Sequence, residues 1–168
     1  MAVAERRGLA GLSVNTVVAE AKLAKGTFYV HFADRDAFLD ALHERFYADV
    51  ADAMAKAVGD QPAGAERLYR GVEAYLEACL ARRGVKALLL EMRSEAHVTS
   101  AIMEREKGFA RLAEPNLRAM GCRDAAVTAR LLVAMTSETA LLELEAGHRV
   151  AAARRSLRRL VELAGTQP

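Results

Sequence analysis

The side chains best suited to chemistry in this sequence lie in two short stretches. Residues 25–32 read KGTFYVHF and combine an ammonium group, a hydroxyl, a phenol and an imidazole with a glycine, although aromatic residues make up only 5% of the chain. Residues 43–47 read HERFY and begin like the zinc motif His-Glu-x-x-His, but Tyr47 stands where the second histidine would bind. We therefore interpret HERFY as an exposed helix surface and take KGTFYVHF as the candidate for function.

A helical wheel separates KGTFYVHF into a core face and an outer face. Phe28 and Phe32 fall on the core face, whereas Thr27 and Tyr29 fall off it, so a purely structural helix is the less favoured interpretation. A glycine within a helix costs about 1 kcal/mol relative to alanine, which is understandable where another surface approaches the backbone closely. Ammonium, hydroxyl and phenol groups can donate hydrogen bonds to phosphate oxygens. The outer face and its flanks consist of Lys25, Gly26, Thr27, Tyr29 and Val30.

The composition predicts an all-α protein. Strong helix formers are frequent among the 168 residues, and proline occurs only three times. Ser13, Asp34 and Asp124 are expected N-caps, and Gly84 and Gly147 are expected helix ends. Pro115 should kink its helix or start a new one. The expected helices cover approximately residues 14–21, 25–32, 35–58, 65–83, 85–96, 99–120, 125–146 and 150–164.

Composition and motif spacing also limit the kinds of function. No apolar run approaches the ~18 residues that span a membrane, and the first residues do not read as a signal peptide. Cys79 and Cys122 are too few for a disulfide framework and are expected to stay reduced in the cytoplasm. The net charge of +2 permits nucleic-acid binding without requiring it. The sequence shows no metal-ligand spacing, phosphate loop or nucleophile elbow, so we expect a cytoplasmic protein that is not an enzyme and uses no metal or cofactor.

The last two expected helices differ in how their apolar residues are distributed. Residues 125–146 are apolar nearly all round, and such a helix must be covered on two sides. Residues 150–164 have one apolar face, while four arginines between residues 154 and 159 fall on the other, which we interpret as solvated. A partner chain is the simplest cover for the remaining apolar surface, so we expect a homodimer through these helices. The candidate interface residues are Leu132, Thr139, Leu142, Leu157, Leu160 and Val161.

The middle of the chain carries side chains that suit a ligand pocket. Aromatic and methionine residues on the expected helices could form the walls of a pocket for a small apolar ligand, although a place in the plain core is an equally good interpretation for each. The polar residues 136–139 interrupt the apolar helix and could line such a pocket or mark the dimer interface. The candidate pocket residues are Tyr75, Met92, Met103, Phe109 and Met135.

Residues 13–39, SVNTVVAEAKLAKGTFYVHFADRDAFL, resemble the DNA-binding signature of TetR-type transcriptional regulators. Two short helices joined by a tight break are typical of a helix-turn-helix, and the blocks GTFY and HF are the most specific part of the match. Residues 40–168 match the family only in helical layout. The resemblance implies a homodimeric regulator, usually a repressor, that binds double-stranded operator DNA and is released by a small ligand.

The resemblance also implies a division of the chain and a set of DNA contacts. Residues 1–36 correspond to the helix-turn-helix head, and residues 37–168 to a larger helical domain for ligand binding and dimerisation. Ser13 matches a position that meets phosphate, His31 matches a histidine near the DNA backbone, and Arg35 stands where a lysine is usual. The positions that match the recognition helix, which meets bases and phosphates, are Lys25, Gly26, Thr27 and Tyr29.

The match departs from the family pattern in three places. Lys22 replaces a glycine in the turn, and Ala24 replaces the serine or threonine that usually caps the recognition helix. These changes cost roughly 1 kcal/mol each if the turn is left-handed and the cap is lost. Only Met1 to Arg7 correspond to the helix that precedes the motif, which suggests a chain that starts earlier or a weakened head. The alternative function is a ligand-binding and dimerisation module with impaired DNA binding.

Overall fold

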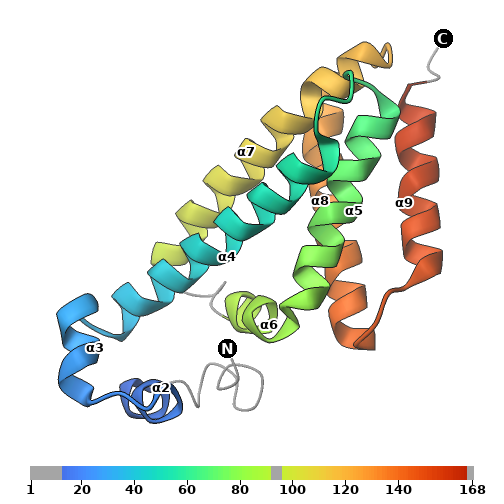
Figure 1. Cartoon of the computed structure of the whole chain (residues 1–168). Helices are drawn as coiled ribbons and strands as arrows, with labels where there is room; N and C mark the ends of the chain where they lie inside the picture. The colour runs from blue at the N-terminus through green and yellow to red at the C-terminus, as the bar shows by residue number, and fades with distance from the viewer. Residues whose placement is uncertain (1–12, 92–95, 166–168) are drawn as a thin grey trace.

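The fold is all-α, as the composition predicts. The computed structural model describes residues 13–91 and 96–165, and within these ranges it contains eight α-helices and no strand (Figure 1). Two short helices form a head at one end, and the other helices form a bundle. The helices are α2 (Val14–Ala21), α3 (Lys25–His31), α4 (Arg35–Val58), α5 (Ala65–Ala81), α6 (Arg83–Glu91), α7 (Ala96–Ala119), α8 (Ala125–Ala146) and α9 (Ala151–Ala164).

The starts of the first helices follow from side chains that cap them. The Ser13 hydroxyl accepts a hydrogen bond from the Thr16 backbone N–H at 3.2 Å, and the Thr16 hydroxyl accepts one from the Ser13 N–H at 2.9 Å. This reciprocal capping box begins α2. The Asp34 carboxylate accepts from the Ala37 N–H at 2.8 Å and begins α4. These two predicted N-caps are therefore confirmed, whereas Asp124, at the N-cap position of α8, makes no side-chain capping bond, so the third is wrong.

The turn between α2 and α3 is left-handed, and a lysine occupies it. Lys22 has φ 55° and ψ 40°, and its backbone N–H donates to the Ala19 carbonyl at 3.2 Å. An L-residue with a Cβ atom pays roughly 1 kcal/mol in this conformation, which glycine would avoid. Ala24 sits at the N-cap of α3 and makes no side-chain capping bond. Both expected local weaknesses of the motif are present in the structure.

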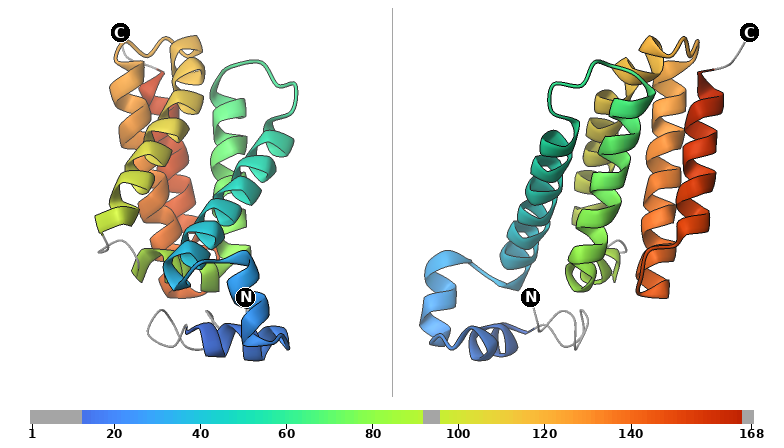
Figure 2. Two further views of the ribbon diagram at one scale, coloured as in Figure 1. Left: turned by 90° about the vertical axis from the view of Figure 1, so that its left-hand side faces the viewer. Right: turned by 45° about the vertical axis from the view of Figure 1, so that its right-hand side comes forward.

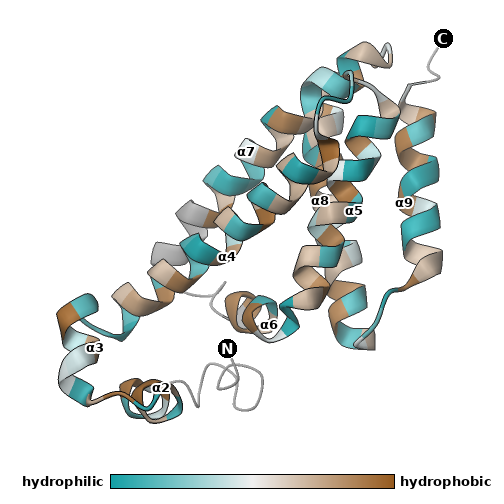
Figure 3. Cartoon of the chain, viewed as in Figure 1, coloured by the Kyte–Doolittle hydropathy of each residue, from teal (hydrophilic) through white to brown (hydrophobic). Residues whose placement is uncertain are grey.

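The core lies in the bundle, where α8 runs between α5, α7 and α9 (Figures 1 and 2). Helices α5 and α9 alternate between hydrophilic and hydrophobic residues along their length, as expected for helices with one buried face (Figure 3). By length and composition α8 is apolar enough to cross a membrane, and in the structure it packs against four helices of the bundle, α5, α6, α7 and α9. The largest fully buried side chains include Phe46, Leu39, Leu76, Leu88 and Leu117.

One predicted helix boundary is wrong. Gly84 does not end α5; the helix ends at Ala81 with Arg82 as its C-cap, and the Lys86 N–H donates to the Arg82 carbonyl at 3.0 Å, so helical bonding resumes at once in α6. Gly84 is buried in the first turn of α6. Helix α7 runs through Pro115, so of the two outcomes expected at this proline the restart of the helix does not occur. Gly147 does end α8, in the left-handed conformation, as predicted.

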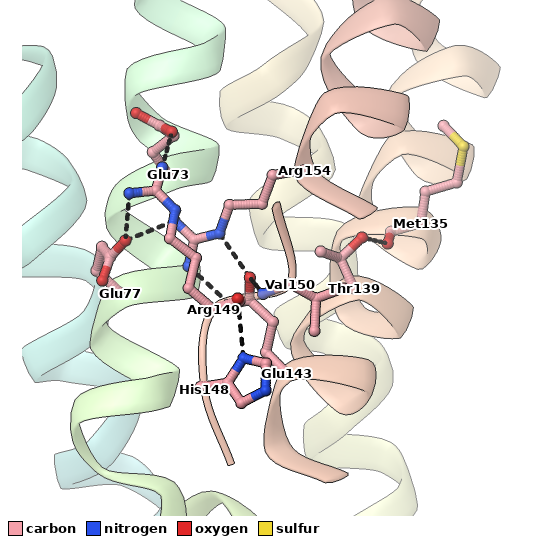
Figure 4. A network of polar contacts seen from close by, with 9 residues as sticks. All are labelled: Glu73, Glu77, Met135, Thr139, Glu143, His148, Arg149, Val150 and Arg154. Carbon is pink, nitrogen blue, oxygen red and sulfur yellow. Dashed lines mark hydrogen bonds and ion pairs between the residues drawn. The ribbon is translucent and has the colours of Figure 1, made fainter. Parts of the chain in front are cut away.

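The prediction that Arg154 lies on a solvated face of α9 is also wrong. Its side chain is 3% exposed and makes a two-pronged ion pair with Glu143 of α8, with Nε 2.6 Å from Oε1 and Nη2 2.7 Å from Oε2 (Figure 4). A third contact joins its Nη1 to Glu77 of α5. Glu143 also accepts the Val150 N–H at 3.0 Å, at the start of α9. Three helices therefore meet at one guanidinium group, which an apolar periodicity cannot reveal.

Replacing Glu143 by glutamine should destabilise the protein by about 3 kcal/mol or more, because it leaves the buried Arg154 cation without its main partner. The free energy of unfolding in urea measures this. The matched control is Glu73→Gln, which removes a surface ion pair with Arg149 and should cost less than about 1 kcal/mol. Equal effects of the two substitutions would show that the buried pair does not stabilise the bundle.

Candidate nucleic-acid interface and internal cavity

An aromatic cluster attaches α3 to the start of α4. The Phe28 ring is 5% exposed and lies with its centroid 5.3 Å from that of Phe32 and 5.6 Å from that of Phe38 on α4. Phe32 and Phe38 are themselves 5.2 Å apart, in an edge-to-face arrangement. Aromatic pairs in these geometries stabilise beyond their buried area. The predicted packing role of Phe28 and Phe32 is confirmed, and Phe38 completes the cluster.

The opposite side of α3 faces solvent. Lys25, Gly26 and His31 are exposed, Tyr29 is 51% exposed, and Thr27 is partly buried. Helix α3 contains no acidic residue. A Cβ atom built on Gly26 would meet nothing within 4 Å, so the fold of the chain does not itself require a glycine there. This surface is open to a partner that approaches the backbone.

The other two predicted DNA contacts flank this surface. Ser13 is exposed at the start of α2, and Arg35 is partly buried at the start of α4, where its Nη1 lies 3.7 Å from Asp36 Oδ1. The head projects from the bundle end at which α4 begins (Figure 2). The structure thus places all seven candidate residues on α2, α3 or the start of α4. Their contacts with DNA remain predictions.

A cavity of about 230 Å³ lies between α4, α5, α6, α7 and α8. Of the predicted pocket residues, Tyr75 and Phe109 line it. Met103 is 51% exposed and Met135 packs against the core, so these two predictions are corrected, and Met92 lies outside the described residues. The apolar walls include Met54, Val72, Ile102, Phe109, Leu132 and Val133.

The polar residues that interrupt α8 divide between the cavity and the core. Thr136 and Ser137 line the cavity, and the Thr136 hydroxyl donates to the Leu132 carbonyl at 2.8 Å. Thr139 is buried and donates to the Met135 carbonyl at 2.9 Å, whereas Glu138 is exposed. For Thr136 and Ser137 the structure selects the pocket over the dimer interface.

The cavity has a charged end that the sequence pattern did not indicate. Lys86 of α6 is 4% exposed, and its Nζ atom donates to the phenol oxygens of Tyr47 and Tyr75, both at 3.3 Å. It also lies 5.6 Å and 5.8 Å from the centroids of these two rings. Burial raises the pKa of Tyr75 well above its usual value, so this phenol stays protonated. The one signal for this site was a lone lysine within the apolar run 85–90.

His43 and Arg105 extend the charged end, and the prediction that the HERFY stretch is an exposed surface is wrong for His43. This imidazole is 4% exposed and lies 2.9 Å from an Nη atom of Arg105, whose guanidinium stacks 4.0 Å from the Tyr47 ring centroid. Burial first, then the charges of Arg105 and Lys86, lower the pKa of His43 to about 4. A guanidinium can only donate, so the facing imidazole nitrogen accepts and the ring is neutral.

Most of the predicted dimer-interface residues lie inside the chain. Leu132, Thr139, Leu157 and Val161 are buried in the core, because they lie on the sides of α8 and α9 that pack against the bundle. This corrects their assignment to a surface between two chains. Leu142 and Leu160 are 42% and 48% exposed and can meet a partner. The other exposed apolar side chains of these helices are Val127, Leu131 and Leu163.

Comparison with known proteins gives two findings. Residues 1–42 match the family model of bacterial regulatory proteins, tetR family, which covers α2, α3 and the start of α4. A TetR-like transcriptional regulator from Rhodococcus sp. RHA1 has a similar structure, with a TM-score of 0.78 and 23% sequence identity over 95% of this chain and 87% of that one. This second likeness confirms the fold. The short first helix expected before the motif falls within residues 1–12, outside the described residues.

His43 should make the protein less stable as the pH falls from about 6.5 to about 4. In this range the unfolded imidazole binds a proton but the folded one does not, so the free energy of unfolding decreases, by about 2 kcal/mol between pH 7 and pH 5. Urea unfolding at the two pH values measures the decrease. In His43→Gln the free energy of unfolding should fall by about 2 kcal/mol less between the two pH values than it does in the unchanged protein. The exposed control His148→Gln should show the same fall as the unchanged protein. An unchanged pH dependence in His43→Gln would contradict a neutral buried imidazole.

Proposed function

We propose that this chain, which belongs to the TetR family of bacterial regulatory proteins, is a sequence-specific DNA-binding repressor released from its operator by a small ligand. The observation that supports this best is the division of α3. Its aromatic side chains attach it to α4, while its exposed side presents an ammonium group, a phenol and a glycine with free space around it. In this proposal α3 is the recognition helix.

The two faces of the head have separate roles in the proposal. Lys25, Gly26, Thr27 and Tyr29 meet bases and phosphates in the major groove, since such donors suit both. Ser13, His31 and Arg35 flank them and meet the phosphate backbone. Such contacts from both ends of the motif fix the orientation of α3 on the duplex.

Helix α4 provides the route by which a ligand acts on the head. Its first turn carries Phe38, which packs against α3, and its later turns carry Tyr47, Met54 and Val58, which line the cavity. A ligand that favours a different position of α4 would therefore also move the head. We assign residues 1–36 to the DNA-binding head and residues 37–168 to the ligand-binding and dimerisation domain.

Dimerisation is assigned to the outer faces of α8 and α9. Val127, Leu131 and Leu142 follow one stripe of α8, and Leu160 and Leu163 are exposed on α9. A two-fold symmetric pair would cover both stripes with the same surface of the partner. Its two recognition helices would then read half-sites about 34 Å apart, in the cytoplasm, where the operator is found.

The direct test is binding to the DNA that flanks the protein's own gene. We expect fluorescence anisotropy to show binding at low salt, with an affinity that falls steeply as salt increases, because phosphate contacts release counterions. A stable dimer that binds neither this DNA nor a pool of genomic fragments would contradict the repressor function. That outcome would leave the alternative, a ligand-binding module with a weakened head.

Replacing Gly26 by alanine should abolish most operator binding without destabilising the protein. The added methyl group meets nothing in the free chain and favours the helix by up to about 1 kcal/mol, but it occupies the space that the DNA backbone would use. The matched control is Gly108→Ala on α7, whose Cβ also meets nothing within 4 Å. Thermal unfolding and anisotropy compare the two variants. Normal operator affinity in Gly26→Ala would exclude a close approach at this residue.

A further inference from the structure

Lys86 is a buried cation without an anionic partner among residues 13–90 and 102–165, whose side chains the structure describes. Its polar contacts there are the two phenol oxygens of Tyr47 and Tyr75, at 3.3 Å each. Taking an ammonium group out of water costs several kcal/mol unless it is paired, and ring faces offset only part of that cost. By contrast, Arg154, which is also deeply buried, is matched by carboxylates. The wall of the cavity thus holds a charge that the described side chains of the bundle do not neutralise.

The hydrogen-bond geometry around Lys86 favours an acceptor inside the cavity. An ammonium group has three N–H donors and cannot accept, so the two phenol oxygens accept from it and a third N–H remains. Because Tyr47 uses its oxygen as the acceptor, its own hydroxyl hydrogen is available for another group. Tyr47 and Lys86 both line the cavity. An oxygen-bearing anion between them would receive two donors from one side.

The charged side chains of the cavity wall are mostly positive, like that of Lys86. Besides Lys86 it includes Arg67, Arg105 and one carboxylate, Glu106. Arg67 donates to the Gln61 carbonyl at 2.6 Å, and Arg105 contacts His43 and the Tyr47 ring. His43 stays neutral near pH 7 and adds no opposing charge. A cavity wall with an excess of positive charge attracts anions and opposes cationic ligands.

The rest of the cavity is apolar and small. Its volume of about 230 Å³ exceeds the roughly 150 Å³ of an engineered cavity that holds benzene. Aromatic and aliphatic walls surround it, with Tyr75 and Phe109 in edge-to-face contact at 5.6 Å. A ligand of this size needs an apolar body and a single charged end.

We propose that the cavity binds a small apolar carboxylic acid, with its carboxylate between Lys86 and the Tyr47 hydroxyl and its body against the apolar walls. This goes beyond the apolar effector expected from the sequence, because it assigns the ligand a charge and an orientation. The binding itself does not depend on the proposed repressor function. Only its regulatory effect, release from DNA, rests on that function.

The test uses the full chain and pairs of probes that differ only in charge. Octanoate and phenylacetate are compared with octanamide and phenylacetamide, and octylamine serves as the cation, all by isothermal titration calorimetry. We expect a carboxylate to bind about 10- to 100-fold more tightly than its amide, as a hydrogen-bonded charge contributes. Octylamine should bind most weakly. Equal affinities for acid and amide, or no binding of either acid at millimolar concentration, would overturn the proposal.

Substitutions test whether the carboxylate of the probe binds to Lys86. Lys86→Met should remove the preference for acid over amide while keeping the apolar volume, whereas Lys56→Met, at an exposed position on α4, should keep it. A preference that survives in folded Lys86→Met would overturn the assignment to Lys86. If Lys86→Met does not fold, a second variant tests the same site. Tyr47→Phe removes the second donor but keeps the ring, so it should reduce the preference for acid over amide several-fold. An unchanged preference in Tyr47→Phe would count against the site.

The effect on DNA is measured separately, so that the two proposals can fail independently. Octanoate added to the operator complex should release it at concentrations near its dissociation constant. Selective binding of the acid without release would support the ligand class and contradict the route through α4. Absence of operator binding altogether would contradict the repressor function but leave the calorimetric result standing.

Discussion

A guanidinium group shared by three helices holds the bundle together. Arg154 joins α9 to Glu143 of α8 and Glu77 of α5, and Glu143 in turn fixes the Val150 N–H where α9 begins. The pair therefore sets the rotation of α8 about its own axis. That rotation turns Thr136 and Ser137 towards the cavity and the leucine stripe of α8 outwards. The cavity and the proposed dimer face both depend on this one interaction.

Two buried cations, Arg154 and Lys86, show how structure and function can be separated. The Nε, Nη1 and Nη2 atoms of Arg154 all donate to carboxylate oxygens. This side chain therefore adds specificity to the fold and is not available to a ligand. Among the residues whose side chains are described, the polar contacts of Lys86 are the phenol oxygens of Tyr47 and Tyr75. A fold that needed Lys86 solely for stability would gain more from an apolar residue of the same size. Its presence in a cavity wall therefore points to recognition.

Local signals in the sequence predicted the parts of the fold that local chemistry decides. The N-caps Ser13 and Asp34 and the stop at Gly147 lie within a few residues of the backbone groups they satisfy, so α2 and α4 begin, and α8 ends, where expected. Phe28 was likewise placed correctly by the periodicity of α3. The prediction that Gly84 ends α5 was wrong because a glycine can either end a helix or allow close packing within one.

The sequence could not show where charge is buried. A helical wheel treats His43, Lys86 and Arg154 as surface residues, and their partners lie on other helices. Arg154 and Glu77, for example, are 77 positions apart in the chain. Several of the predicted pocket and dimer-interface residues were wrong for a related reason. When a helix is apolar on all sides, as α8 is, composition does not say which side a neighbour covers, and only the packed structure separates Leu132 from Leu142.

The aromatic attachment of α3 has a consequence for the cooperativity of folding. Among residues 13–32 only Val18 and Phe28 are buried hydrophobic residues, and the turn and cap between α2 and α3 are both unfavourable. Segments with so few buried contacts open at lower free energy than the core that carries them. We therefore expect the described part of the head to open more readily than the bundle that carries it. A partner that binds only its closed form stabilises it by mass action, so operator DNA would act as a folding ligand for α2 and α3.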